Sequence, residues 1–394
     1  MSLLKDRAFR ATALSHLSID LLNSQHPLLL AVLSVPLGLS NSVIGLVSTA
    51  YSLSGSLSQP LFGILADRIG NRFVELGGLI WMAAFFSLAF SVEGPAALVF
   101  LVLASLGSGA YHPAATAEAT ERGRVHLSRM ETTAASFFFF FGQGGLFLGP
   151  AIGGPLLDRW GPMGLFMLFI FILPVAIYML PKAALDVEKA VSTEATNTNV
   201  PARTTTNWSY VIPFVITIFT RSWTQVSMMT FLPKYLQDLG FRPSVFGPIA
   251  ALYMGGSAFG GIAGAWLADR FGNRYVMTAS LLLASIPLFF YGSISTTWLL
   301  VLVTLFAGAF IGASHSIIVV LAQRLLPGKS GVASGLVLGF TFASGSIGAF
   351  FSGLIADASG FNLLFLILAG LMALSTLTSA RMHQMQRERL TVPG

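Results

Sequence analysis

Residues 65–72 read LADRIGNR, and residues 267–274 read LADRFGNR. The two stretches share seven of eight residues and lie roughly 200 positions apart in a chain of 394 residues. Each stretch ends one long apolar segment and begins the next. A repeat at about half the chain length is too long for a solenoid unit, so the sequence predicts two homologous halves.

Other landmarks recur at nearly the same offset and support this duplication. The matching pairs are Ser42-Val-Ile-Gly45 with Ser244-Val-Phe-Gly247, Tyr51 with Tyr253, His112 with His315, and Gly154 and Asp158 with Gly353 and Asp357. The sequence therefore contains two copies of one unit that carries these motifs.

The composition indicates a membrane protein with many spans. Hydrophobic residues make up 54% of the chain and charged residues 10%, whereas about a quarter of the residues in a soluble domain are charged. Apolar runs of about twenty residues, long enough to cross a bilayer, recur along the whole length. The first apolar stretch follows Lys5, Arg7 and Arg10 without a small-residue cleavage site, so we expect an uncleaved first helix. With no cysteine, disulfides and thiol chemistry are excluded.

We predict an all-α protein of twelve transmembrane helices, in two pseudo-symmetric six-helix halves around a central cavity. The expected spans are 11–33, 42–64, 73–91, 96–117, 129–152, 163–180, 209–232, 244–267, 276–292, 298–321, 331–355 and 362–380. Residues 1–180 form the first half, and residues 208–394 form the second half with a charged tail. Residues 181–207 are polar and rich in Thr and Asn, which is typical of a flexible linker.

The distribution of Lys and Arg sets the expected orientation. With twelve spans both termini lie on one side, which holds 18 of the 22 Lys and Arg residues, whereas the other side holds three, Arg159, Lys234 and Arg242. We therefore place both termini and the linker in the cytoplasm and the chain in the cell inner membrane. Topology accounts for the net charge of +6, so nucleic acid is not an expected partner. The remaining basic residue, Arg221, falls inside span seven.

Twelve spans in two halves with this loop motif resemble the major facilitator superfamily. Residues 63–72, GILADRIGNR, fit that family's cytoplasmic loop motif almost letter for letter, whereas the second copy has Ala265 in place of Gly63. Ser15-His16-Leu17 with Asp20, and Tyr111-His112-Pro113, are similar to the fosmidomycin-resistance branch of drug/proton antiporters. The resemblance implies an alternating-access carrier whose substrate site lies between the halves.

The resemblance assigns roles to two motifs. In the family, the loop-motif Asp faces a helix N-terminus in the other half and latches the cytoplasmic side, where carboxylates are favoured by the helix dipole. The residues expected in this gate are Gly63, Asp67, Arg68, Gly70, Arg72, Asp269, Arg270, Gly272 and Arg274. Span five carries a glycine motif that looks like that of the family's antiporters, namely Gly145, Gly149, Pro150, Gly153 and Gly154. Close helix packing alone would also explain these glycines.

Two charged residues lie where charge is costly. Asp20 falls close to the bilayer midplane in span one, where an ionised Asp costs about 2.5–3.5 kcal/mol on insertion scales. His16 precedes it by one turn, so we expect Asp20 and His16 to carry protons, with a structural polar contact as the alternative. Arg221 lies at a similar depth in span seven. We expect it to pair with Asp20 in the empty cavity and otherwise to bind a carboxylate, phosphate or phosphonate. A permanent buried pair that serves only the structure is the alternative.

Other polar residues in the spans are candidates for substrate binding. They are His112, His315 and Gln225 and, second in rank, His26, Gln25, Gln143 and Tyr111. The histidines lack metal-ligand spacing and no paired carboxylates stand out, so we expect neither an enzyme nor a metal or cofactor site.

The function predicted from the sequence is secondary active transport, with proton-coupled efflux by antiport of a small organic or drug-like compound as the leading form. A proton symporter or a facilitator for an organic anion or a lipid-like substrate is the alternative. The expected partners are a small-molecule substrate, protons and the lipid bilayer, and we expect a monomer. The run 137–141, five Phe residues, is expected to face lipid or to fill space in helix packing, with an aromatic cage as the alternative.

Overall fold

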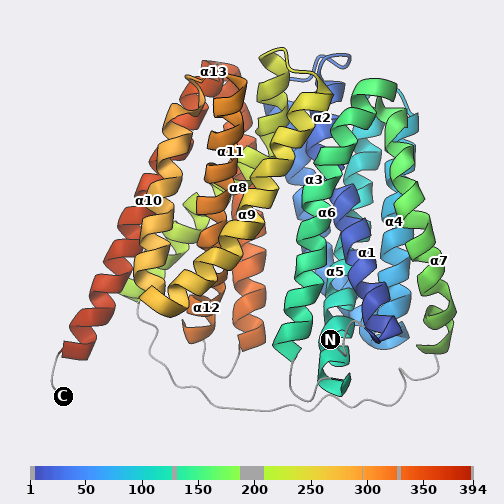
Figure 1. Ribbon diagram of the computed structural model, residues 1–394, viewed down its shortest axis with the longest axis horizontal. Coiled ribbons are helices and arrows are strands. Elements are labelled where there is room, and N and C mark those ends of the chain that lie inside the picture. Colours follow the sequence, from blue (N-terminus) through green and yellow to red (C-terminus); the bar gives the residue numbers. More distant parts are fainter. Residues whose placement is uncertain (1–4, 127–130, 187–207, 295, 326–329, 392–394) are drawn as a thin grey trace. The chain divides into compact units, whose positions relative to one another are not determined.

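The computed structural model describes residues 5–126, 131–186, 208–294, 296–325 and 330–391, and these ranges are helical almost throughout (Figure 1). The helices of the first half are α1 (Arg7–Asn23), α2 (Gln25–Ser34), α3 (Asn41–Ile69), α4 (Asn71–Ser91), α5 (Ala96–His126), α6 (Glu131–Trp160), the short 3-10 helix η2 (Pro162–Leu168) and α7 (Phe169–Asp186). Those of the second half are α8 (Trp208–Asp238), α9 (Pro243–Phe271), α10 (Asn273–Tyr291), α11 (Thr297–Ala313), α12 (His315–Leu325) and α13 (Ser330–Thr391).

These helices supply the twelve predicted crossings within the described ranges. The helix pairs α1 with α2, η2 with α7, and α11 with α12 each form one crossing, interrupted at a single point. The long α13 contains two helices that meet at Gly360, whose φ of 79° and ψ of 170° are not helical. Glycine adopts such a positive φ without the steric cost that other residues meet.

The helices differ in how apolar they are. Eight helical segments of the described chain are long and apolar enough to cross a membrane, and the longest of them, Gly339–Met382, holds two crossings. The helices α1, α2, α3 and α8 are not among them, although each coincides with a span, or a part of one, predicted from the sequence. Asp20 and Arg221 lie on α1 and α8, so the least apolar crossings carry the charged candidate residues.

Several element ends differ from the prediction. The helix α7 continues to Asp186, so the start of the predicted linker is helical, while residues 187–207 of that linker lie outside the described residues. The predicted tail from residue 381 likewise continues α13 as far as Thr391. In the two loop motifs, Gly70 and Gly272 have φ of 97° and 90° and precede α4 and α10, as a tight turn there requires.

The chain divides into two compact units. Unit 1 comprises Met1–Leu39, Ala50–Thr196 and Pro233–Ala251, and unit 2 comprises Ser40–Thr49, Asn197–Leu232 and Leu252–Gly394. The units differ from the two predicted halves at two short segments. The N-terminal end of α3 belongs to unit 2, whereas the end of α8 and the N-terminal end of α9 belong to unit 1.

Glycine contacts set the helix packing of each unit. In unit 1, α4 and α5 approach so closely that a Cβ on Gly78 would lie 2.6 Å from the carbonyl oxygen of Gly107. In unit 2, a Cβ on Gly256 of α9 would overlap the carbonyl oxygen of Leu305 on α11. Small residues at such contacts are the usual packing surface of membrane helices, because lipid offers no hydrophobic driving force between them.

Candidate functional site

The candidate site of unit 1 is built around Asp20 on α1. Its side chain is buried, and its Oδ2 lies 3.2 Å from Nε2 of His16, one helical turn earlier. Its Oδ1 lies 3.6 Å from Nε2 of His112 on α5 and accepts a 2.8 Å hydrogen bond from Asn23. The structure therefore brings the predicted residues His16, Asp20 and His112 into one cluster, which we call the Asp20 cluster.

The other nitrogen of each imidazole ring is held by the main chain. Nδ1 of His16 lies 2.8 Å from the carbonyl oxygen of Phe138, and Nδ1 of His112 lies 2.9 Å from that of Ser108. A carbonyl oxygen only accepts, so each Nδ1 carries a proton and donates it. In a neutral ring this leaves Nε2 as an acceptor that faces a carboxylate oxygen, which is also an acceptor. Each of the two contacts to Asp20 thus becomes favourable only when a proton or a cation lies between the two atoms.

The helix α6 closes the cluster from the side. The ring of Phe138 stacks on that of His16 with centroids 3.9 Å apart. A Cβ on Gly142 would lie 2.5 Å from Nε2 of His16 and 2.7 Å from Oδ2 of Asp20. Of the Phe run expected to face lipid or to fill packing space, Phe137, Phe139 and Phe140 are exposed, whereas Phe138 is buried against the cluster.

The glycine motif of α6 continues this contact along α1 and α2. A Cβ on Gly145 would overlap the carbonyl oxygen of Leu17, and one on Gly149 or Gly153 would overlap Ser24 or Gln25. Gly154 instead lies against Gly247, at the beginning of α9 in unit 1. The carbonyl oxygen of Pro150 also lies against Gly247. Each glycine of the motif thus has a packing contact, whether or not the motif has a role in antiport.

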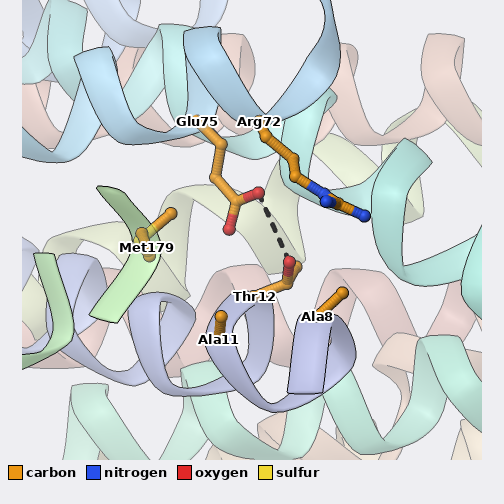
Figure 2. A pocket seen from close by; sticks show the side chains of 6 residues that line it. All are labelled: Ala8, Ala11, Thr12, Arg72, Glu75 and Met179. Carbon is orange, nitrogen blue, oxygen red and sulfur yellow. Dashed lines mark hydrogen bonds between the residues drawn. The ribbon is translucent and has the colours of Figure 1, made fainter. Parts of the chain in front are cut away.

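A second buried carboxylate, Glu75, was missed by the sequence prediction. It lies on α4 with no exposed surface, and Ser15 and Thr12 of α1 hydrogen-bond to it at 2.8 and 3.3 Å. Thr12, Arg72 and Glu75 line a small, partly open pocket together with Ala8, Ala11 and Met179 (Figure 2). Glu75 comes three residues after the loop motif ends, so its position could be taken for the membrane edge. The cost of a carboxylate inside an apolar span was the signal that could have found it.

The loop-motif residue Arg72 is anchored within unit 1. Its guanidinium donates two hydrogen bonds, of 2.9 and 2.7 Å, to the largely buried Oε1 of Glu118 on α5, which also accepts from Arg122. Asp67 and Asp269 are both exposed, and neither makes a hydrogen bond or ion pair with any described residue. Their part in a cytoplasmic gate stays a prediction.

In unit 2 the candidate site centres on Arg221 of α8. This side chain is 1% exposed and donates to Oγ of Ser314 at 3.1 Å and to the carbonyl oxygen of Ile311 at 3.2 Å. Within the described part of the chain it has no carboxylate partner, and the buried hydroxyl of Tyr253 lacks a hydrogen-bond partner. Asp20 and Arg221 each have partners in their own unit, so the expected ion pair between them stays a prediction.

The remaining predicted residues have varied surroundings. Tyr111 is buried beside the Asp20 cluster, with its ring centroid 5.9 Å from that of His16. Gln25 is buried under α6, and its Oε1 has no hydrogen-bond partner among the described residues. The ring of His26 stacks on that of Tyr51 with centroids 4.3 Å apart. His315, which begins α12, and Gln143 are exposed, whereas Gln225 is partly buried. Their roles in substrate binding remain untested predictions.

The Asp20 cluster is also compact enough for a metal ion. One ligand atom from each of His16, Asp20 and His112 lies within 4.8 Å of the other two. The sequence predicted no metal because the three residues have no metal-ligand spacing along the chain. Their proximity comes from the packing of α5 on α1, which spacing in one sequence does not report.

Comparison with known proteins identifies the family. The sequence profile described as Major Facilitator Superfamily matches residues 11–242 and 214–389. The chain belongs to the Major Facilitator Superfamily. Its relatives in this superfamily include the fosmidomycin resistance protein of Escherichia coli, which is 28% identical over 379 residues and covers 93% of this chain and 91% of that one. The quinolone resistance protein NorA of Staphylococcus aureus is 23% identical over 332 residues, which cover 82% of each chain.

Solved structures of the superfamily share the fold. The nucleoside transporter NupG superposes with a TM-score of 0.75 at 20% identity, covering 96% of this chain and 99% of that one. The peptide transporter POT gives a TM-score of 0.78 at 15% identity, with 96% and 95% covered. The chain is therefore a multi-pass membrane transporter with the predicted fold, and not an enzyme. It takes a small molecule as its substrate, as the sequence predicted.

Proposed function

We propose that this transporter is a proton-coupled antiporter that exports small organic compounds, with the Asp20 cluster as its proton site. The observation that carries the proposal is the pairing of two imidazole Nε2 atoms with the two oxygens of Asp20. Because both Nδ1 atoms already donate to carbonyl oxygens, each contact needs its own proton. The cluster accordingly holds up to two exchangeable protons.

Loss of one proton changes the forces between helices α1 and α5. With both imidazoles charged, Asp20 attracts His16 on its own helix and His112 on α5. Without a proton between Asp20 and His112, two acceptors face each other at 3.6 Å and repel. A buried site strengthens both the attraction and the repulsion, since water does not screen them. Protonation can thereby bias the position of one helix against another, which is what coupling requires.

Arg221 is the proposed anchor for a negatively charged group of the substrate. A buried guanidinium without a carboxylate partner is costly, and its planar fork matches a carboxylate, phosphate or phosphonate. Tyr253, with its unpaired buried hydroxyl, is a neighbouring donor of the same unit. The relatives named for fosmidomycin and quinolone resistance support export of drug-like compounds. The proposed carrier works as a monomer in a cell inner membrane.

The test is transport in proteoliposomes with an imposed pH gradient, using a phosphonate, an organic anion and a lipophilic cation as substrates. Asp20→Asn is expected to abolish gradient-driven transport while substrate binding persists. Arg221→Ala is expected to weaken binding of anionic substrates tenfold or more and to leave proton coupling intact. Glu93→Gln, which changes an exposed carboxylate between α4 and α5, serves as the control and should behave as the parent.

Three results would contradict the proposal. If the Asp20→Asn carrier still concentrates substrate against its gradient, Asp20 is not the proton site. If substrate and protons move in the same direction, the carrier is a symporter, and if the gradient has no effect it is a facilitator.

A further inference from the structure

The oxygen atoms around Glu75 make more contacts at hydrogen-bond distance than there are hydroxyl protons to form hydrogen bonds. Oγ of Ser15 lies 2.8 Å from Oε1 of Glu75, 2.9 Å from the carbonyl oxygen of Thr12 and 2.8 Å from the hydroxyl of Tyr111. The Tyr111 hydroxyl in turn lies 3.0 Å from the carbonyl oxygen of Thr12. Ser15 and Tyr111 contribute one proton each, so with an ionised Glu75 two of these four contacts are hydrogen bonds.

A proton on Glu75 raises this number to three. It is donated from Oε1 to Ser15, which then donates to Tyr111 or to the carbonyl oxygen of Thr12. Glu75, Ser15 and Tyr111 are all completely buried, and a buried polar contact without a proton is costly. A proton at Oε1 therefore adds one hydrogen bond to the network. A carboxylate that served only packing would not need this proton.

The charges near Glu75 come from two helices. On α4 itself, Arg72 lines the same pocket, but its guanidinium is held by Glu118 of α5. The α5 helix presents Glu118 and the Tyr111 hydroxyl, and α1 presents the neutral hydroxyls of Thr12 and Ser15. The α7 helix presents Met179. The nearest cation is thus engaged by another carboxylate.

The pocket gives Glu75 a way to exchange a proton. It has room for about one water molecule and lies between α1, α4 and α7 at the loop-motif end of unit 1, as Figure 2 shows with Arg72 and Glu75 above Ala8, Ala11 and Thr12. Thr12 precedes Asp20 by eight residues, or about 12 Å along a helix. Ser15 and His16 are consecutive, so the network around Glu75 ends where the Asp20 cluster begins.

We propose that Glu75 is a second proton-binding site of this carrier, which takes its proton from water in the pocket beside Arg72 and passes its state to the Asp20 cluster through Ser15 and Tyr111. A protonated water in the pocket transfers its proton to Oε1 of Glu75, so that one O–H bond of the water breaks as the O–H bond of Glu75 forms, and the reverse step returns the proton to water. As a part of the transport cycle this site rests on the proposed function, but its protonation is measurable without transport.

The two halves of the chain support a special role for this position. The repeat runs on from the loop motif as NRFVE in residues 71–75 and as NRYVM in residues 273–277. Met277 thus occupies the place of Glu75 and is likewise completely buried. A methionine fills this position in one half of the same fold, so the scaffold does not require a carboxylate there.

The experiment is infrared difference spectroscopy of the purified full-length protein in lipid nanodiscs, stepped between acidic and alkaline pH. We expect Glu75→Gln to remove a protonated-carboxyl band that Asp20→Asn and Glu93→Gln retain. Ser15→Ala and Tyr111→Phe should shift the frequency of that band, because each removes a hydrogen bond of the network. Should Glu75→Gln fail to fold, Glu75→Asp together with Ser15→Ala provides the same comparison through band shifts.

The outcomes separate the two proposals. A Glu75→Gln spectrum that matches the parent overturns the second proton site, whatever the transport assays show. If the Glu75 band is present but Asp20→Asn transports normally, the proposed function fails at Asp20 and Glu75 remains a proton-binding group. A changed pH profile of transport in Glu75→Gln, with substrate binding preserved, would connect the site with the cycle.

Discussion

At the scale of single residues, the important feature is how protons are shared. His16 and His112 differ in helix and in burial, yet both fix Nδ1 on a main-chain carbonyl oxygen and turn Nε2 toward Asp20. Such an outer contact determines which ring nitrogen is available, and it makes the geometry of the cluster depend on protonation. Asn23 adds a donor to Asp20 and is itself held by the hydroxyl of Tyr51 at 2.7 Å.

The tight contact of α6 on the cluster leads to a residue-scale prediction. Gly142→Ala would place a methyl group 2.5 Å from His16 and 2.7 Å from Asp20, and overpacking of this kind costs about 1–3 kcal/mol. We expect gradient-driven transport to fall by about tenfold or more. Gly144→Ala is the matched control, since its Cβ would meet only Leu17 at 3.8 Å. Equal transport by the two variants would show that α6 does not shape the proton site.

The sequence predicted which residues belong to the candidate site better than it predicted which of them are in contact. Asp20 and His16 could be found because a charge and an imidazole one turn apart are conspicuous in an apolar helix. His112 was predicted to bind substrate, and its approach to Asp20 depends on how α5 packs on α1. Glu75 escaped notice because its burial depends on α1 and α7, both distant in the sequence.

At the scale of elements, two carboxylates contact the beginnings of α3 and α9, two helices at equivalent positions in the two halves of the chain. Asp357 of α13 accepts hydrogen bonds of 2.8 Å from the backbone N–H groups of Asn41 and Ser42, the first residues of α3. Asp158 of α6 pairs with Arg242, just before α9, at 3.0 Å, and also accepts a side-chain hydrogen bond from Ser244 at the beginning of α9. The sequence pattern matched these aspartates but gave no hint of what they bind.

The different partners of these aspartates predict different stabilities. Asp357→Ala removes a carboxylate from the N-terminus of α3 and should cost about 0.5–2 kcal/mol. Asp158→Ala breaks a pair whose Arg242 side chain is 75% exposed, which should cost about 1 kcal/mol or less. We expect thermal unfolding in detergent to fall more for Asp357→Ala. High salt should reduce the Asp158 effect more than the Asp357 effect, and an equal salt response would contradict the assignment of a helix cap.

Most elements could be predicted, since apolar length and the turn glycines mark them. The ends were less accurate at α7 and α13, which continue into polar sequence that was expected to leave the helix. Pro181 is a helix breaker and favoured an end at α7, but Ala, Leu and Lys after it, like Gln, Arg and Glu in α13, are good helix formers.

At the scale of the whole molecule, the orientation in the membrane is still a prediction from the Lys and Arg distribution. The absence of cysteine permits a clean test with two single-cysteine variants. Ser192→Cys, in the predicted linker and outside the described residues, should resist an impermeant thiol reagent in whole cells and react after lysis. Glu93→Cys, in the loop between α4 and α5, should react in whole cells. The opposite pattern would reverse the assigned orientation.

The composition of unit 1 has a consequence for the synthesis of this transporter. Pro233–Ala251 belongs to this unit although it follows the first half in sequence. Domains commonly fold from the N-terminus while translation continues, but here the ribosome must pass about residue 251 before the unit has all its parts. We therefore expect the first six crossings to lack their contacts with this segment until the second half of the gene is being translated. A chain that stalls within the linker would leave a fragment for quality-control proteases to recognise.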